Sequence, residues 1–334
     1  MKKSIPAQVK KALLGLMVIG LMIVFSGCAK ETSQPESKTV QLGIIQIAEH
    51  PALDAARQGF LDTLAKNGYI EGKNLKVDYQ NAQGDQPTLQ SIANKFVQDK
   101  KDIILAIATP SAMTMAKETS EIPILITAVT DPVTAKLVNS LEKPGTNVTG
   151  TTDMNPVAKQ LELIKELVPG VKAVGVVYNS SEINSEVQVK IAREAAPQLG
   201  LELKEASVTA SNEISQATRS LVGKVDALYI PTDNMVIASL AAVLQVAEQN
   251  KIPVIAGESN SVEQGALATL GIDYAKLGSQ TGEMALRVLK GEKPQDMPVE
   301  WQKENDIVIN LKAAERMGVT VSSEIKGKAS RIIE

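Results

Sequence analysis

The stretch LAIATPSAMTMAK, residues 105–117, decides the fold class, because an aliphatic strand there runs directly into a segment that looks helical. Pro110 suits the first turn of a helix, where its missing N–H is not needed. Thr109 and Ser111 can cap that turn. The free N–H groups behind them and the positive end of the helix dipole favour a small anion. The junction therefore predicts a strand–helix unit with an anion site at the helix N-terminus.

Strand and helix patterns alternate on both sides of this junction. The β-branched runs VQLGIIQI, NLKVDY, DIILAIA and IPILITAV are separated by amphipathic segments, an order typical of a parallel sheet with right-handed crossovers. After EKPGTNVTGTTD (residues 142–153) the plan starts again with AVGVVY, LELKEASV, DALYI and IPVIAG. We therefore predict an α/β protein made of two doubly wound parallel-sheet lobes.

Each lobe is expected to contain two stretches of chain. We assign residues 39–149 plus 262–297 to the first lobe and residues 150–261 plus 298–334 to the second. ALATLGIDY and the helix after it would complete the first lobe, and DIVINLKAAERMG the second. The lobes would join near Gly145 and Gly150, with further crossings at residues 260–264 and 294–301. Several crossings make a hinge, and a hinge places a closing cleft between the lobes.

The amino terminus predicts export. Four lysines precede an apolar run at residues 12–25, and small residues and a cysteine follow in FSGC, which is the layout of a secretory signal. The run is shorter than the roughly 20 residues that span a bilayer, although an uncleaved anchor remains an alternative. The segment resembles a bacterial lipoprotein signal, with residues 1–27 as signal peptide, Cys28 as the residue that receives lipid (palmitate) and residues 28–38 as a flexible tether. Cys28 is the only cysteine, which excludes a disulfide within the chain.

Polar residues follow nearly every predicted strand, and ligands of open α/β sheets bind beyond these strand ends. The candidate ligand-binding residues are Glu49, His50, Thr109, Ser111, Thr130, Asp131, Asn179, Ser180, Asp233, Asn234, Glu258 and Asp273. Any one of them could simply cap the next helix, but the acids among them exceed what capping requires. A carboxylate on the N–H groups after Thr109, with an ammonium group facing one or two acids, describes a free amino acid.

The apolar end of such a ligand is harder to place, because only 3% of the residues are aromatic. Tyr178 and Tyr274 lie at predicted strand ends and could stack on a ring. Met113, Met154 and Met235 could instead form a soft wall for an irregular apolar group.

Several motifs together resemble a known family. EHPALDAARQGFLDTLAKNGYIEGKNLKVDYQNAQGD, ATPSA, AVTDPV, PGTNVTG and IPTDN are similar to the solute-binding lipoproteins of bacterial ABC importers, in the branch that binds tryptophan and other aromatic amino acids. The resemblance spans essentially the whole mature chain. It implies a type I periplasmic-binding fold with three interlobe crossings, hinge closure on the ligand, and delivery to a permease with its own ATPase. It also implies a small-residue turn at Thr109, Ser111 and Ala112, an aspartate turn at Asp131, and an ammonium partner at Glu258.

The expected function is binding without catalysis. The sequence has a single histidine without an evident partner, no nucleophilic triad, no clustered metal ligands and no phosphate-binding glycine motif, so neither an enzyme nor a cofactor or metal is predicted. An enzyme using Asp131 and Glu258 across the cleft is an alternative. The slightly negative net charge without a basic stripe disfavours nucleic acid.

We therefore expect a monomeric lipoprotein on the extracytoplasmic face of the cell membrane that binds an aromatic or large apolar amino acid and works with an ABC permease and its ATPase. The alternatives are a ligand-sensing lipoprotein that feeds a membrane receptor, and a binder of a nucleoside or a sugar.

Overall fold

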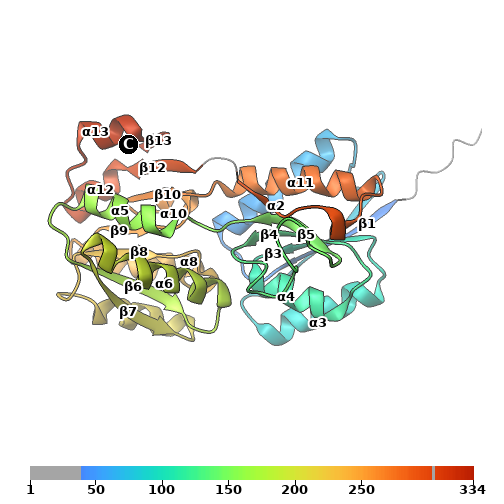
Figure 1. The fold of residues 1–334 in the computed structure, drawn as a ribbon, viewed down its shortest axis with the longest axis horizontal. Coiled ribbons are helices and arrows are strands. Elements are labelled where there is room, and N and C mark those ends of the chain that lie inside the picture. Colours follow the sequence, from blue (N-terminus) through green and yellow to red (C-terminus); the bar gives the residue numbers. More distant parts are fainter. Residues whose placement is uncertain (1–38, 303–304) are drawn as a thin grey trace, which may run out of the picture. The chain divides into compact units, whose positions relative to one another are not determined.

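A computed structural model describes residues 39–302 and 305–334, and residues 39–334 group into one unit (Figure 1). The signal peptide, Cys28 and the tether lie outside the described residues. Two sheets organise the unit. The first sheet has the strand order β11 (Glu300–Trp301), β5 (Val148–Thr152), β4 (Ile124–Val129), β3 (Ile103–Ile107), β1 (Val40–Gln46) and β2 (Leu75–Asn81).

The second sheet has the strand order β13 (Arg331–Ile333), β12 (Asp306–Asn310), β10 (Ala268–Gly271), β9 (Val254–Ala256), β8 (Ala227–Ile230), β6 (Ala173–Asn179) and β7 (Glu202–Val208). Every strand pair in the two sheets is parallel except β10 with β12. The predicted fold class, two doubly wound and mainly parallel sheets, is confirmed.

Helices flank both sheets, and we call each sheet with its helices a lobe. The first lobe contains α2 (Pro51–Lys66), α3 (Gln86–Gln98), α4 (Thr109–Glu118), α11 (Tyr274–Leu289) and the 3-10 turn η3 (Pro294–Asp296). The second lobe contains α5 (Val157–Leu167), α6 (Ile183–Ala195), η1 (Pro197–Leu199), η2 (Ser211–Glu213), α7 (Ile214–Ser220), α8 (Asn234–Ala238), α9 (Leu240–Gln249), α10 (Ser259–Glu263), α12 (Leu311–Met317) and α13 (Ser323–Lys328).

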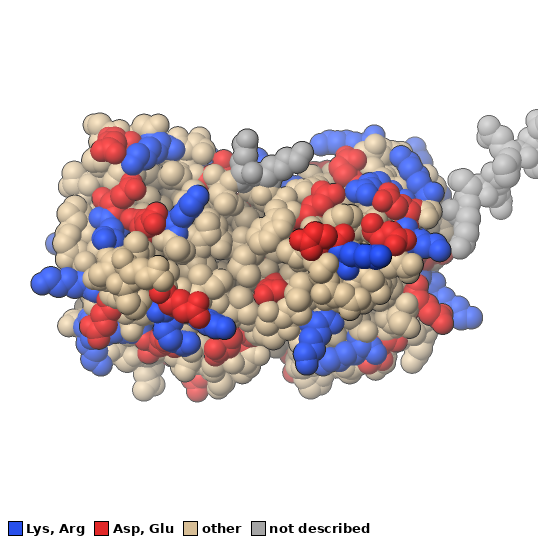
Figure 2. All heavy atoms as spheres, viewed as in Figure 1, with Lys and Arg blue, Asp and Glu red and all other residues tan. Residues whose placement is uncertain are grey.

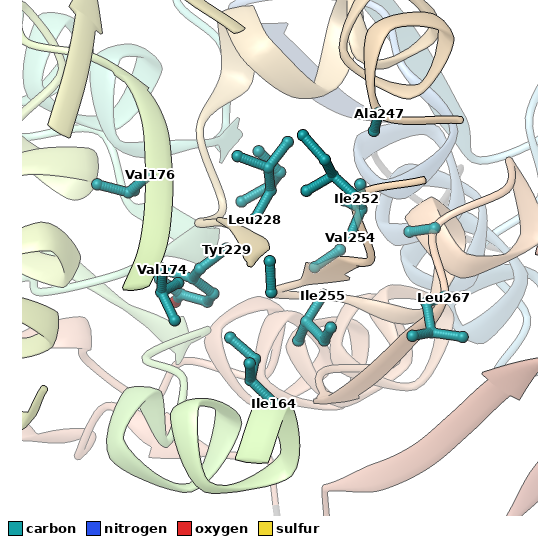
Figure 3. Packing of buried hydrophobic residues seen from close by; sticks show 14 of the residues in the cluster. Ile164, Val174, Val176, Leu228, Tyr229, Ala247, Ile252, Val254, Ile255 and Leu267 are labelled. Atoms are coloured by element: carbon teal, nitrogen blue, oxygen red, sulfur yellow. The ribbon is translucent and has the colours of Figure 1, made fainter. Parts of the chain in front are cut away.

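Each sheet has its own hydrophobic core. All five residues of β3 are buried, as expected for a central parallel strand that is covered by helices on both faces. Figure 3 shows part of the core of the second lobe, where aliphatic side chains surround the ring of Tyr229. Its labelled members are Ile164, Val174, Val176, Leu228, Tyr229, Ala247, Ile252, Val254, Ile255 and Leu267. Two separate cores explain why the chain forms two lobes.

The chain passes between the sheets after β5, after β10 and after β11. The prediction that ALATLGIDY completes the first lobe is therefore wrong for the strand and right for the helix. β10 pairs with β9 and β12 of the second sheet, and the crossing follows at Ile272 and Asp273 rather than at residues 260–264. The antiparallel pairing with β12, a strand forty residues later, decides the place of β10, and no local pattern encodes such pairing.

The predicted junction at Gly145 and Gly150 is also displaced. Gly150 lies inside β5 with a φ of +141°, and a Cβ atom there would lie 2.1 Å from the backbone oxygen of Ile126. The N–H of Gly145 donates to the Gln295 carbonyl oxygen at 3.0 Å, within the first lobe. Glycine at residue 150 is thus required by the close approach of β4 to β5, and the first crossing begins only after Thr152.

Helix α11 packs along α2 and completes the first lobe (Figure 1). Glycines make this approach possible, because a Cβ atom on Gly278 would lie 1.9 Å from the backbone oxygen of Ala56. The hydroxyls of Thr151 and Thr281 hydrogen-bond at 2.8 Å and tie the same helix to β5. Among the described residues, no helix combines the length and the apolar character that a membrane crossing needs.

Candidate functional site

A small buried cavity is lined by residues from both lobes. His50, Ala128, Asp153 and Tyr274 come from the first lobe, and the remaining polar lining comes from the second: Asn184, Thr232, Asp233, Asn234 and Glu258. Its free volume of about 10 Å³ accommodates roughly one water-sized group. Several of the polar lining residues, including Asp153, Asp233 and Glu258, follow strand ends, which is where open α/β sheets bind ligands.

A larger groove of about 560 Å³ shares Asn234 with this cavity and is also lined by both lobes. Its apolar wall includes Ile47, Pro110, Met113, Ile183 and Met235. On the face of the molecule shown in Figure 2, charged side chains gather over the two lobes, and few lie in the band between them. Together, the cavity and the groove offer a polar inner end and an apolar outer end.

The predicted strand–helix junction at residues 105–117 is confirmed, and α4 begins at Thr109 with Pro110 in its first turn. The prediction that Thr109 and Ser111 cap this turn is wrong, because Ala108 holds the N-cap position and no side chain caps the helix. The hydroxyls of Thr109 and Ser111 are buried without a hydrogen-bond partner. Ala108, just before the helix, has a φ of +76°, a strained conformation for a residue with a side chain. Unpaired donors, a helix N-terminus and backbone strain in one turn suit the binding of an anionic group.

His50 is buried at the start of α2, with 6% of its surface exposed. Neither ring nitrogen has a partner with hydrogen-bond geometry. The nearby Asn234 amide of the second lobe slightly raises the pKa of the ring. Burial lowers the pKa of His50 to about 4, against a smaller opposing effect of Asp54. The imidazole is therefore neutral near pH 7 and can accept or donate one hydrogen bond.

The two acids of the second lobe that line the cavity cap helices. Glu258 accepts hydrogen bonds from the N–H groups of Asn260 and Ser261 at the start of α10. Burial raises the pKa of Glu258 to about 7.

Asp233 accepts from the Asn179 N–H at 2.6 Å, the Ser185 hydroxyl at 2.6 Å and the Val236 N–H at 2.8 Å. Burial and the charge of Glu182 raise the pKa of Asp233 to about 7. Capping therefore accounts for the backbone hydrogen bonds of Glu258 but for only one of the three hydrogen bonds of Asp233, and both acids line the cavity.

Asp153 is a third cavity acid, which the sequence analysis did not select. It follows β5 directly, where the chain leaves the first sheet. Its carboxylate accepts a hydrogen bond from the Thr130 hydroxyl at 3.0 Å and another from the Tyr274 hydroxyl. Burial raises the pKa of Asp153, although both hydroxyls act in the opposite direction.

The geometry fits a ligand-binding protein, and comparisons with known proteins agree. The family model for ABC transporter substrate binding proteins matches residues 41–333. The chain belongs to this family. A curated relative, the tyrosine-binding protein of Clostridioides difficile (strain R20291), is 49% identical over 311 residues, which is 90% of each chain.

Two solved structures of similar proteins represent a ligand-bound state and a ligand-free state. A domain from Streptococcus pneumonia in complex with L-Trp is 38% identical, covers 89% of this chain and 100% of its own, and has a TM-score of 0.86. A ligand-free, open substrate-binding protein with adhesive properties from Clostridium difficile is 52% identical, covers 88% and 99%, and has a TM-score of 0.67. The family consists of binding proteins, which confirms the prediction that this substrate-binding protein is not an enzyme.

The structure divides the predicted site residues of this family member into three groups. His50, Asp233, Asn234 and Glu258 line the cavity, and Asn179 lines the groove. Thr109, Ser111, Ala112 and Thr130 are buried but belong to neither lining, although Thr109 and Ser111 flank Pro110 of the groove. Glu49, Asp131, Ser180 and Asp273 line neither space.

The outlying residues have local roles or face solvent. Glu49 and Ser180 are exposed. Asp131 accepts from the N–H groups two and three residues later, and Asp273 caps α11 in the same way. Asp131 therefore does not face Glu258 across the cavity, which removes the geometric basis of the enzyme alternative.

The sequence pattern did not point to Asp153, Glu182 and Asn184 as site residues. Asp153 was overlooked because VTGTT was interpreted as part of the junction between the lobes, whereas its run of β-branched residues on either side of Gly150 is a strand signal. Within the described residues, no group of histidine, cysteine or acidic side chains has the arrangement of a metal site.

Proposed function

We propose that this substrate-binding protein binds an aromatic amino acid of the tyrosine and tryptophan class between its lobes. The relationship to a tyrosine-binding protein over 90% of both chains carries this proposal. The L-Trp complex of the Streptococcus pneumonia domain supports the same ligand class. The polar cavity and the adjoining groove match the two ends of such a ligand.

The first step of recognition is capture of the ligand carboxylate at the N-terminus of α4. The hydroxyls of Thr109 and Ser111 are donors without an acceptor, and the helix adds N–H groups that no side chain caps. A hydrogen bond to a charged group contributes about 1.5–3 kcal/mol, so two or three of them account for a large share of micromolar binding.

The aromatic ring is proposed to lie in the groove. Met113 of α4 and Met235 of α8 line it from opposite lobes. Sulfur–ring contacts contribute about 0.3–1.5 kcal/mol each, and methionine adapts to rings of different size. The predicted stacking partner Tyr178 is absent from the described lining, and its hydroxyl donates to Glu205 at 3.1 Å.

Ligand binding is proposed to accompany lobe closure. The arrangement here resembles the L-Trp complex more than the ligand-free, open relative, although the open relative is closer in sequence. A cavity with space for one water-sized group also indicates lobes that are close together. We expect small-angle scattering to show a smaller radius of gyration with ligand than without it.

We further propose that Cys28 anchors the protein by lipid to the extracytoplasmic face of the membrane, where a monomer delivers its ligand to an ABC permease and its ATPase. The lipoprotein-like signal sequence and the family of transporter binding proteins support this role. Replacement of Cys28 by Ala should abolish incorporation of labelled palmitate and release the protein from membranes. Incorporation that persists in the variant would refute the anchor.

The ligand proposal is tested by calorimetric titration of the full chain against the twenty amino acids, after bound ligand is removed by unfolding and refolding. We expect micromolar or tighter binding of tyrosine, tryptophan or both. Ser111→Ala should weaken binding by about 10-fold because one charge-assisted hydrogen bond is lost. The matched control is Ser91→Ala in α3, whose hydroxyl already donates to the Pro87 carbonyl oxygen at 3.0 Å. No binding of any amino acid would refute the proposal.

A further inference from the structure

We infer that Asp153 is the acceptor for the ammonium group of the ligand. The inference rests on the proposed amino-acid function and identifies which buried carboxylate meets the positive charge. Three carboxylates line the cavity, Asp153, Asp233 and Glu258, and the described lining includes neither lysine nor arginine. A buried cavity of this charge favours a cation.

The size of the cavity selects the kind of cation. A volume of about 10 Å³ accommodates one water-sized group, which an ammonium group resembles. No set of described histidine, cysteine or acidic side chains has a metal-binding arrangement. Asn234 lines both the cavity and the groove, so the two spaces adjoin there, and the rest of the ligand is inferred to lie in the groove.

Hydrogen bonding distinguishes Asp153 from the other two acids. Asp233 and Glu258 accept backbone N–H groups of the helices that they cap, so local structure explains their presence. Asp153 precedes α5 by four residues and caps no helix. From other residues it accepts only hydroxyl donors, those of Thr130 and Tyr274, and its own backbone N–H also acts on the carboxylate. A carboxylate has about four acceptor positions, so Asp153 retains acceptor capacity for a ligand.

A second observation, independent of the acids, points to the same ligand group. The side chain of Asn184 is 3% exposed, and its Oδ1 atom has no hydrogen-bond donor. Its Nδ2 atom donates to a Glu182 carboxylate oxygen at 3.0 Å and to the Thr232 carbonyl oxygen at 3.1 Å. Those two acceptors fix the orientation of the amide, so the unsatisfied atom is an acceptor.

An ammonium group supplies three donors, and it can bond to Asp153 and to Asn184 Oδ1 at once. Asp153 belongs to the segment that leaves the first sheet, whereas Asn184 lies in α6 of the second lobe. The Tyr274 partner of Asp153 begins α11, directly after the second crossing. One positive charge in this position would thus connect both lobes beside two of the crossings, and it would favour the closed arrangement.

The experiment compares two probes on the full chain, L-tyrosine and 3-(4-hydroxyphenyl)propionate, which lacks only the amino group. We expect Asp153→Asn to weaken tyrosine binding by about 10- to 100-fold and to leave the desamino probe within about 3-fold. Asp131→Asn is the control, because Asp131 follows the neighbouring strand β4 but lines neither the cavity nor the groove. It should change neither affinity.

Equal weakening of both probes by Asp153→Asn, or no change in either, would overturn the inference while leaving the proposed function intact. If that variant does not fold, Asn184→Ala decides the question. If Asn184→Ala lowers the ratio of tyrosine affinity to desamino-probe affinity by about 3-fold or more, the ammonium site is supported. If that ratio does not change, the inference is overturned. Failure of the unmodified chain to bind tyrosine or tryptophan would refute the proposed function itself.

Discussion

Replacing Gly278 by Ala tests the physical basis of the first lobe. The added Cβ atom would lie 1.9 Å from the Ala56 oxygen, 2.6 Å from its carbonyl carbon and 2.7 Å from its Cα atom. All three atoms are backbone, so α2 and α11 must separate by about 1.5 Å at this point to restore ordinary contact. A gap of about 0.5–1 Å already forfeits a quarter to a half of the dispersion energy at each facing contact.

The helix-propensity gain from Gly to Ala, about 1 kcal/mol, opposes this loss but is smaller. We expect Gly278→Ala to lower the free energy of unfolding by about 3 kcal/mol, at the upper end of the range typical of overpacked cores. Urea unfolding followed by circular dichroism measures the change. The control is Gly327→Ala in α13, where a Cβ atom meets nothing within 4 Å and the stability should rise by up to about 1 kcal/mol. A Gly278→Ala protein as stable as the parent would refute the assigned close packing.

Three further predictions concern titration. His50 is the only histidine, so its NMR signal should titrate near pH 4 in the folded protein, and a midpoint near 6.5 would contradict its burial. Because the folded pKa lies below the unfolded value, His50→Gln should reduce the stability loss that occurs as pH falls from 6.5 to 4. Ionisation of Glu258 changes stability in the opposite direction with pH. Its pKa in the folded protein, about 7, exceeds the value of 4.5 in the unfolded chain. Glu258 therefore lowers the free energy of unfolding by about 3 kcal/mol as pH rises from 4.5 to 7. The stability of Glu258→Gln relative to the parent should therefore increase between pH 4.5 and 8. A difference between their denaturation midpoints that does not change with pH would contradict this prediction.

The strand–helix junction at residues 105–117 could be predicted because its determinants are local. Aliphatic residues and a proline within a few positions set the strand and the helix start. That the hydroxyls of Thr109 and Ser111 are left unpaired rather than capping the helix was not predicted. The two-lobe plan followed from the same alternation repeated along the chain. These features depend on periodicity and capping, which a single sequence contains.

The site was predicted less completely, because the direction of a side chain depends on distant partners. Asp131 and Asp273 follow strands, as Asp233 does, yet their carboxylates bind backbone N–H groups outside the cavity. Asp153 lines the cavity because β5 turns it toward Tyr274, which lies 121 residues later. The place of β10 likewise depends on β12. Pairing over such separations has no signature within either segment alone.

Helix α11 belongs to the first lobe but follows most of the second lobe in the sequence, which affects the order of folding. The Thr151–Thr281 hydrogen bond joins residues 130 positions apart, and the bond from Ser279 to the Gly59 carbonyl oxygen spans 220 positions. Contacts of such separation require closure of long loops and slow the search for the native state. A chain emerging from the ribosome therefore has all but one strand of the first sheet long before it has the helix that covers them. Its amino-terminal half therefore lacks the contacts of α11 until most of the second lobe has been synthesised.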